Sequence, residues 1–489
     1  MFTAFDNFPA LLIWLPLIGG LVAFMLKDGT KVRSWALFSS IITLAVMALS
    51  LHYTGNEHVE LQTVSYYWLK DLGSSFALSL DGLSRMLCLL TAISFPIIIT
   101  ATWKNPISNA NAYYGLLLLT QCGLMGVFMA TDMLVFYFFW ELALVPVYFL
   151  ASQWGGERRI QAAFKFFIYT FLGSLLMLVG IIFVYLRTPE QSFSMASFFH
   201  AQLTSGEQGW LFWLFFIAFA IKMPVFPFHT WQPDAYDQTS PAVTMVLSGV
   251  MVKMGVFAVL RWLLPMFPEA VKHVDKLVIG LSVTGMVYAS IIATRQDNLK
   301  KLVAYSSIAH IGLMCATLFA QSNIGTQGVM IQMFNHGINI IGMWIVVDQI
   351  EQQTGVRKIS ELGGIAWRAP VLTILLVIIA LANVALPLTN AFVGEFLMFS
   401  GLYGFSPIYA AVAGLSIILS AVYTLNMIKN VFYGETNVLT ANMVEAGLQV
   451  RVMLAIIVVL IFMMGVFPGP MFDLLKQGTE TLFLKTTVK

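Results

Sequence analysis

Six ionisable side chains lie within long apolar stretches of this chain, where a charge is costly. They are Glu141, Lys222, Lys253, His310, His336 and Glu395. A charge at the centre of a membrane helix costs roughly 2.5–3.5 kcal/mol on insertion scales, so such residues face partners or water and usually serve ion or proton movement. Carboxylates, lysines and histidines all take up and release protons. The pattern therefore predicts a proton relay buried at mid-membrane depth.

The composition of the chain favours a membrane protein. Of its 489 residues 59% are hydrophobic and 10% are charged, whereas soluble domains have about 45–50% and about 25%. No basic block suggests nucleic acid binding. The three cysteines are scattered, and no Cys-x-x-Cys, Gly-x-Gly-x-x-Gly or P-loop pattern occurs, so we expect no metal, cofactor or nucleotide site in this chain.

A helix needs about 20 mainly apolar residues to cross a membrane. Dividing the apolar stretches of the chain by this length predicts an all-α protein of about 14 spans. The first is expected to be a membrane helix and not a cleaved signal peptide, because no small-residue cleavage site follows it. The stretch 369–404 is too long for one span and is expected to be a single broken helix. The predicted spans are 9–26, 34–53, 82–103, 112–130, 133–152, 163–187, 209–230, 241–264, 275–294, 300–320, 326–348, 369–404, 407–432 and 450–472.

The distribution of Lys and Arg predicts the orientation. Loops after odd-numbered spans hold 15 of these residues and loops after even-numbered spans hold six. Because cytoplasmic loops carry the excess of positive charge, both termini are expected outside the cytoplasm. In the long loop 54–81, the alternation over 64–68 predicts a short hairpin or surface strand.

Two predicted helix breaks suggest an internal repeat. Pro224 and Pro227 follow Lys222, and Pro387 precedes Glu395; proline removes a backbone donor and interrupts a helix. Lys222 and Glu395 are 173 residues apart, and Glu141 and His310 are 169 residues apart. Two five-span units at this offset would have opposite orientations, as in ion-coupled transporters; coincidence is the alternative. We expect units at 111–265 and 266–435, flanked by 1–110 and 436–489.

Each candidate residue also has a purely structural interpretation. Glu141 and Lys222 could form a static ion pair, and the prolines could serve packing alone. A buried histidine is often a satisfied core residue, although two of them in consecutive spans favour a relay. The glycines on either side of Lys253 could simply let helices approach closely.

Three motifs resemble a known family. The segments 138–142 (FFWEL), 154–170 (WGGERRIQAAFKFFIYT) and 226–235 (FPFHTWQPDA) resemble the antiporter-like membrane subunits of bacterial NADH:quinone oxidoreductase, respiratory complex I. This resemblance covers essentially the whole chain and implies 14 helices, periplasmic termini and one proton channel. The family's functional residues match all six candidates. A carboxylate at Glu395, where the L and N types usually carry lysine, favours the M type. The segments 237–242 and 387–392 depart from the family pattern, which puts the geometry at these breaks in question.

The resemblance also implies an assembly in the bacterial inner membrane. NADH, FMN, iron–sulfur clusters and quinone would be bound by other subunits, and the neighbouring partners would be the antiporter-like subunits L and N. Two alternatives remain at this point. The chain could belong to a multisubunit Na⁺/H⁺ antiporter or a membrane-bound hydrogenase, or it could be a non-pumping scaffold, although retention of every mid-membrane charge speaks against the scaffold.

Overall fold

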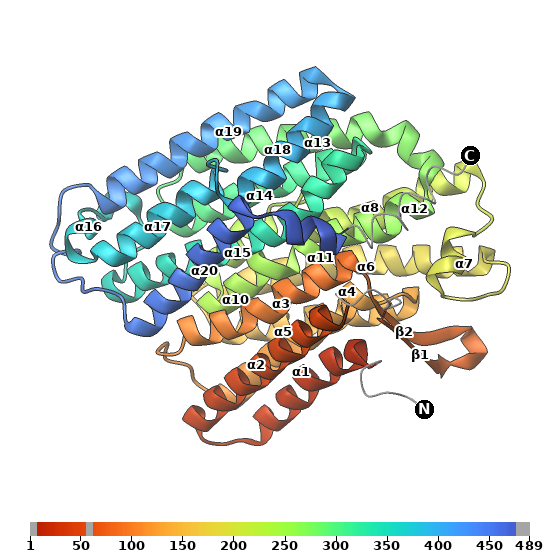
Figure 1. Cartoon of the computed structure of the whole chain (residues 1–489), viewed down its shortest axis with the longest axis horizontal. Helices are drawn as coiled ribbons and strands as arrows, with labels where there is room; N and C mark the ends of the chain where they lie inside the picture. Colours follow the sequence, from red (N-terminus) through yellow and green to blue (C-terminus); the bar gives the residue numbers. More distant parts are fainter. Residues whose placement is uncertain (1–6, 55–61, 476–489) are drawn as a thin grey trace.

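The computed structural model describes residues 7–54 and 62–475, and these form a bundle of long helices with one β-hairpin (Figure 1). The N-terminal helices lie along the lower edge in this view, and α18 and α19 lie along the upper edge. The N-terminal elements are α1 (Phe8–Met25), α2 (Gly29–Thr54), β1 (Gln62–Leu69), η1 (Lys70–Leu72), β2 (Ser74–Leu80) and α3 (Gly82–Ala101).

The middle of the chain contains the first broken span. Its elements are α4 (Ala110–Met129), α5 (Met133–Gln153), α6 (Arg159–Arg187), α7 (Met195–Phe199), α8 (Ser205–Lys222), α9 (Trp231–Gln238), α10 (Pro241–Val246), η2 (Leu247–Met251), α11 (Lys253–Ala258), η3 (Val259–Leu263) and α12 (Leu264–Met266).

The C-terminal part contains the second broken span. Its elements are α13 (Pro268–Arg295), α14 (Leu299–Phe319), α15 (Asn323–Thr354), η4 (Ile359–Glu361), α16 (Ile365–Arg368), α17 (Pro370–Asn383), α18 (Asn390–Phe405), α19 (Pro407–Met427), η5 (Ile428–Phe432) and α20 (Leu448–Val466).

The predicted spans agree with the helices. Among the described residues, twelve helical stretches are long and apolar enough to cross a membrane. The other two predicted spans are the broken ones, α8 with α9 and α17 with α18. The predicted end of the first broken span at 230 was too early, because a second half follows the break. That half, 231–238, has the sequence WQPDAYDQ. It is too polar to be recognised as part of a membrane span by hydropathy.

The predicted strand at 64–68 is confirmed as part of a hairpin. Strand β1 pairs antiparallel with β2, with Gln62 opposite Leu80 and Tyr66 opposite Phe76. The beginning of the predicted loop, with Glu57 and Glu60, lies outside the described residues. The hairpin is at the right in Figure 1, and the backbone N–H of Thr131 donates to Ala77 to hold it against the bundle.

The loops divide the molecule into two ends. The loops that follow the odd-numbered spans are bonded to one another; for example, the Asp237 carboxylate accepts from Asn298 at 2.9 Å, and Asn105 accepts from Gln352 at 2.6 Å. We call this the basic end, formed by loops 26–28, 102–109, 154–158, 239–240, 296–298, 355–364 and 433–447. The opposite end, which carries β1 and β2, is the hairpin end.

The helix that carries Lys253 contains two π turns. Residues 241–266 run as α10, η2, α11, η3 and α12, and both η2 and η3 are π-helical. In η2 the backbone N–H of Val252 donates to Leu247, five residues back, at 3.1 Å. Single π turns inside α-helices are frequent at functional sites.

Candidate functional site

Lys253 and His336 are in direct contact at the centre of the bundle. The Lys253 ammonium nitrogen lies 2.9 Å from Nδ1 of His336, and it donates to the Ser248 carbonyl at 2.6 Å. Because the Val252 N–H bonds to Leu247, it does not compete for the Ser248 carbonyl. The π turn therefore supplies the acceptor that positions the lysine. Lys253 is completely buried.

His310 and Glu395 form the second contact. Nδ1 of His310 lies 2.9 Å from Oε1 of Glu395, and the Gln332 amide donates to the same oxygen at 3.3 Å. Both side chains of the pair are buried. A cavity of about 20 Å³ adjoins them, lined in part by Ser416, Ser420 and Tyr423 of α19. That is enough space for one water molecule.

The two contacts meet through the histidine rings. The ring centroids of His310 and His336 are 5.4 Å apart. Within the described part of the chain, Nε2 of each ring has no hydrogen-bond partner. A histidine with one bonded and one free ring nitrogen can receive a proton on one side and release it on the other. Lys253, His336, His310 and Glu395 thus form a continuous line of titratable groups.

Glu141 and Lys222 lie near this line but do not form an ion pair. Lys222 lies over the Trp140 ring, 5.4 Å from its centroid, and interacts electrostatically with Glu141. Among the described residues, neither Lys222 Nζ nor Glu141 Oε1 has a hydrogen-bond partner. Lys222 is buried and Glu141 is half-buried. The static ion pair considered from the sequence is therefore not what the structure shows.

The helix breaks place Lys222 and Glu395 beside the central helices. At the first break, the Trp231 indole N–H donates to the Ile221 carbonyl at 2.9 Å, so α9 is fastened next to Lys222. At the second, the amides of Asn339 and Asn390 exchange two hydrogen bonds of 3.0 Å each. The amide of Asn335 also donates to the Asn390 carbonyl, at 2.7 Å. These amides fix the start of α18 on α15 and aim Glu395 at His310.

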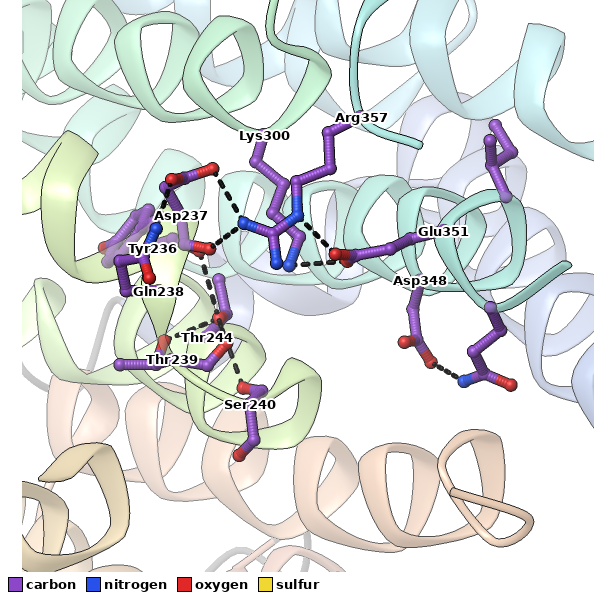
Figure 2. A network of polar contacts seen from close by, with 12 residues as sticks. Tyr236, Asp237, Gln238, Thr239, Ser240, Thr244, Lys300, Asp348, Glu351 and Arg357 are labelled. Carbon is purple, nitrogen blue, oxygen red and sulfur yellow. Dashed lines mark hydrogen bonds and ion pairs between the residues drawn. The ribbon is translucent and has the colours of Figure 1, made fainter. Parts of the chain in front are cut away.

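A polar network closes the basic end and ties the two halves of the chain together (Figure 2). Arg357 reaches between Asp237 and Glu351, donating to the Asp237 carbonyl at 2.9 Å and pairing with the Glu351 carboxylate. Lys300 also pairs with Glu351, at 2.6 Å. The network thus includes Asp237, the first residue of the atypical segment 237–242.

A cavity of about 480 Å³ lies beside this network, and we call it the vestibule. It is formed by the loops 102–109 and 154–156, the α9–α10 junction and the end of α15. Polar side chains on its wall include Thr239, Ser240, Lys300, Asp348, Glu351 and Arg357.

The six predicted residues divide into three neighbouring groups: Glu141 with Lys222, Lys253 with His336, and His310 with Glu395. Sequence reasoning missed Gln332, Ser248 and the asparagines at the second break. Asn390 could have been found, because an amide inside a predicted break needs partners. Ser248 could not have been found from its residue type, because it binds Lys253 through its backbone carbonyl, which every residue has. No group of three or more His, Cys, Asp or Glu side chains suited to a metal ion occurs in the described ranges.

Comparisons with known proteins show the family of this chain. A family model described as NADH:quinone oxidoreductase/Mrp antiporter, TM, matches residues 130–421. The NADH-quinone oxidoreductase subunit M of Rickettsia bellii is 34% identical over 482 residues, covering 97% of this chain and 98% of that protein.

Solved structures share the fold. A chain of respiratory complex I from Thermus thermophilus with bound NADH superimposes with a TM-score of 0.90 at 28% identity, covering 98% of this chain and 99% of that one. A chain of the Mrp complex from Dietzia superimposes with a TM-score of 0.87 at 20% identity, covering 99% of this chain and 98% of that one, which shows a common fold alone.

Proposed function

Because this chain belongs to the family of NADH-quinone oxidoreductase subunit M, a proton-translocating membrane subunit, we propose that it conducts protons along the six ionisable residues of its centre. Glu141 and Lys222 form the switch at the first break, Lys253, His336 and His310 form the central relay, and Glu395 is the gate at the second break. The observation that carries the proposal is the line of contacts from Lys253 to Glu395, in which two contacts of hydrogen-bond length are joined by the ring contact between His336 and His310.

The electrostatic attraction between Glu141 and Lys222 would be of the size that a switch needs. Two unit charges about 8 Å apart attract by about 2 kcal/mol at an effective dielectric of about 20. Moving one charge against about 100 mV needs about 2.3 kcal/mol. Closing or opening this pair would therefore change the affinity of Lys222 for its proton by about the free energy of one transfer step. The absence of an ion pair between Glu141 and Lys222 supports an open arrangement of this switch.

The energy for pumping comes from partner subunits in this proposal. The cofactors that complex I membership implies reside in other subunits, and we propose that this chain holds none. Its neighbours would be the antiporter-like subunits L and N, and the membrane would be the bacterial inner membrane. The units 111–265 and 266–435 would be the two inverted repeats, with Lys222 and Glu395 at matching positions of their broken helices.

NADH-driven proton uptake into inverted vesicles tests the relay. We expect Glu141→Gln and Lys222→Ala each to abolish most of the uptake assigned to this subunit, while the assembled complex still contains all subunits. Glu190→Gln, an exposed carboxylate at the hairpin end, serves as the matched control and should pump like the native protein. Normal uptake with either relay variant in an intact complex would remove that residue from the path.

A further inference from the structure

Asp348, near the end of α15, is the only carboxylate on the vestibule wall, within the described residues, that forms no ion-pair contact, although the charge of Lys300 acts on it from further away. The neighbouring Glu351 pairs with both Lys300 and Arg357. Asp348 instead accepts from two neutral amides, from Gln352 at 2.7 Å and from Asn105 at 3.2 Å. The separation of Asp348 from the Arg357 network is visible in Figure 2.

This difference matters for proton uptake. A carboxylate in an ion pair must give up its attraction to the cation when it is protonated, whereas one held by neutral amides keeps most of its contacts. Asp348 is only 4% exposed but lies on the wall of a 480 Å³ cavity, which has room for many water molecules. It is therefore the vestibule group best placed to take up a proton from water.

A ladder of hydroxyl groups leads from the vestibule toward Lys253. Thr239, on the vestibule wall, lies 2.7 Å from the Thr244 hydroxyl, Oγ1 to Oγ1. One helical turn further, the Ser248 hydroxyl donates to the Thr244 carbonyl at 2.8 Å, and the Ser248 carbonyl accepts from Lys253. Figure 2 shows the vestibule end of this ladder, Thr239 and Thr244, with Ser240 beside them on one side of the network.

We propose that Asp348 is a proton-loading carboxyl that supplies Lys253 from the vestibule, along the Thr239–Thr244–Ser248 ladder, by a route that does not pass through Glu141 and Lys222. One proton leaves water and forms an O–H bond on Asp348. That bond then breaks as hydroxyl groups and intervening water pass the proton on, and an N–H bond forms on neutral Lys253. Asp348 returns to the carboxylate form. The inference rests on the proposed relay through Lys253.

The alternative role of Asp348 is structural, as an acceptor that ties the loop 102–109 to α15. Substitutions separate the two roles, because Asp348→Asn keeps a polar side chain of the same shape but cannot carry the proton, whereas Asp348→Glu can. We expect Asp348→Asn to reduce NADH-driven proton uptake by about tenfold and Asp348→Glu to keep most of it. Asp297→Asn, which changes an exposed carboxylate at the same end that bonds Ser360, is the matched control.

Two further measurements keep the test decisive. Thr244→Val removes a ladder hydroxyl that takes no part in the hydrogen bonds of Asp348, and it should lower uptake even if Asp348→Asn prevents assembly. Infrared difference spectra in H₂O and D₂O should contain a protonated-carboxyl band that is absent in Asp348→Asn. Native uptake in Asp348→Asn, or equal losses in Asp348→Asn and Asp348→Glu, would overturn the inference. Lys253→Ala distinguishes a failure of the proposed relay from a failure of the loading role of Asp348. If Lys253→Ala pumps normally, the relay through Lys253 is wrong. If Lys253→Ala does not pump while Asp348→Asn does, only the loading role is wrong.

Discussion

At the scale of single residues, the central line alternates groups of different chemistry. A lysine contacts a histidine, the histidine faces a second histidine, and that one contacts a glutamate. The first and last transfers therefore move a proton between unlike groups, the middle transfer moves it between the two histidines, and the charge of one group affects the next. Glu395 is the only carboxylate of this line and sets where the line ends. Among the described residues, Tyr423 is the only further titratable group that lines the small cavity beside it.

Replacing Glu395 should separate proton conduction from stability. In Glu395→Gln the amide still fills the space and can bond His310, so we expect assembly to be preserved. The carboxylate that could accept a proton from His310 is lost, and NADH-driven proton uptake should fall about tenfold. Vesicle uptake measured against NADH oxidation tests this. If uptake per NADH oxidised stays at the native value, Glu395 is not the gate.

At the scale of elements, the distance between the first switch and the central relay depends on one close helix contact. A Cβ atom at Gly255 would lie 2.7 Å from Cβ of Met223, next to Lys222. We expect Gly255→Val to push α11 away from the end of α8 and to lower proton uptake several-fold, in a complex that still assembles. Gly414→Ala, in α19, meets no atom within 4 Å and is the control. An unchanged uptake in Gly255→Val would mean that this spacing does not matter.

At the hairpin end, a buried ion pair joins β2 and α3 to the Lys253 helix. The Arg261 guanidinium donates to Asp81 at 2.6 Å, and both side chains are at most 10% exposed. Burial acts to raise the pKa of the Asp81 carboxyl, but the attraction of Arg261 and the hydrogen bonds from Arg261 and Ser84 outweigh it, so this pKa lies below its usual value.

Removing this carboxylate should therefore be costly at neutral pH. Asp81→Asn leaves a buried guanidinium without its counter-charge, which costs about 3–5 kcal/mol, and should lower the thermal inactivation temperature of the purified complex. Because the pKa of Asp81 is lowered, the stabilisation is present above the usual carboxyl pKa and is lost only as the pH falls through the lowered value. The deficit should thus be constant between about pH 6 and 8. A double variant with Arg261→Met should recover part of it, and a deficit that changes across this range would contradict the assignment.

Much of the arrangement of elements could be predicted because one sequence property is enough to locate each kind of element. Hydropathy located the spans, and Pro224, Pro227 and Pro387 located both breaks. The second half of the first broken span could not be found in this way, because its residues, WQPDAYDQ, are stabilised by contacts with other helices and not by lipid. The six central residues were found because charge is rare there. Asp348 was not found, because it stands at the predicted end of the span 326–348. A carboxylate at the end of a span is typical of an ordinary charge at the membrane surface.

At the scale of the whole molecule, the two ends differ in chemistry, and this leads to a test of orientation. The basic end carries the excess of Lys and Arg, and α1 begins and α20 ends at the opposite, hairpin end, as the bond from Tyr66 to Asn7 shows for α1. The terminal residues 1–6 and 476–489, for which periplasmic locations are predicted, lie outside the described residues.

Cysteine labelling in intact cells tests this orientation. The native Cys88, Cys122 and Cys315 are buried and can be replaced by alanine or serine to give a silent background. Glu190→Cys at the hairpin end should react with a membrane-impermeant reagent in intact cells. Lys358→Cys at the basic end, which is also exposed, should react only after the membrane is opened. The reverse pattern would invert the assignment of the two sides.

The π turn before Lys253 has a consequence for sequence length. A π turn accommodates one residue more than an α turn, so η2 behaves like a single-residue insertion that the helix has absorbed without breaking. Deleting one residue there would restore the regular α winding with the flanking turns still aligned, but the N–H of Val252 would then bond to the carbonyl four residues back. Lys253 would thereby lose the free carbonyl to which it now donates. We therefore expect the number of residues between Pro241 and Lys253 to be held more strictly than their identities.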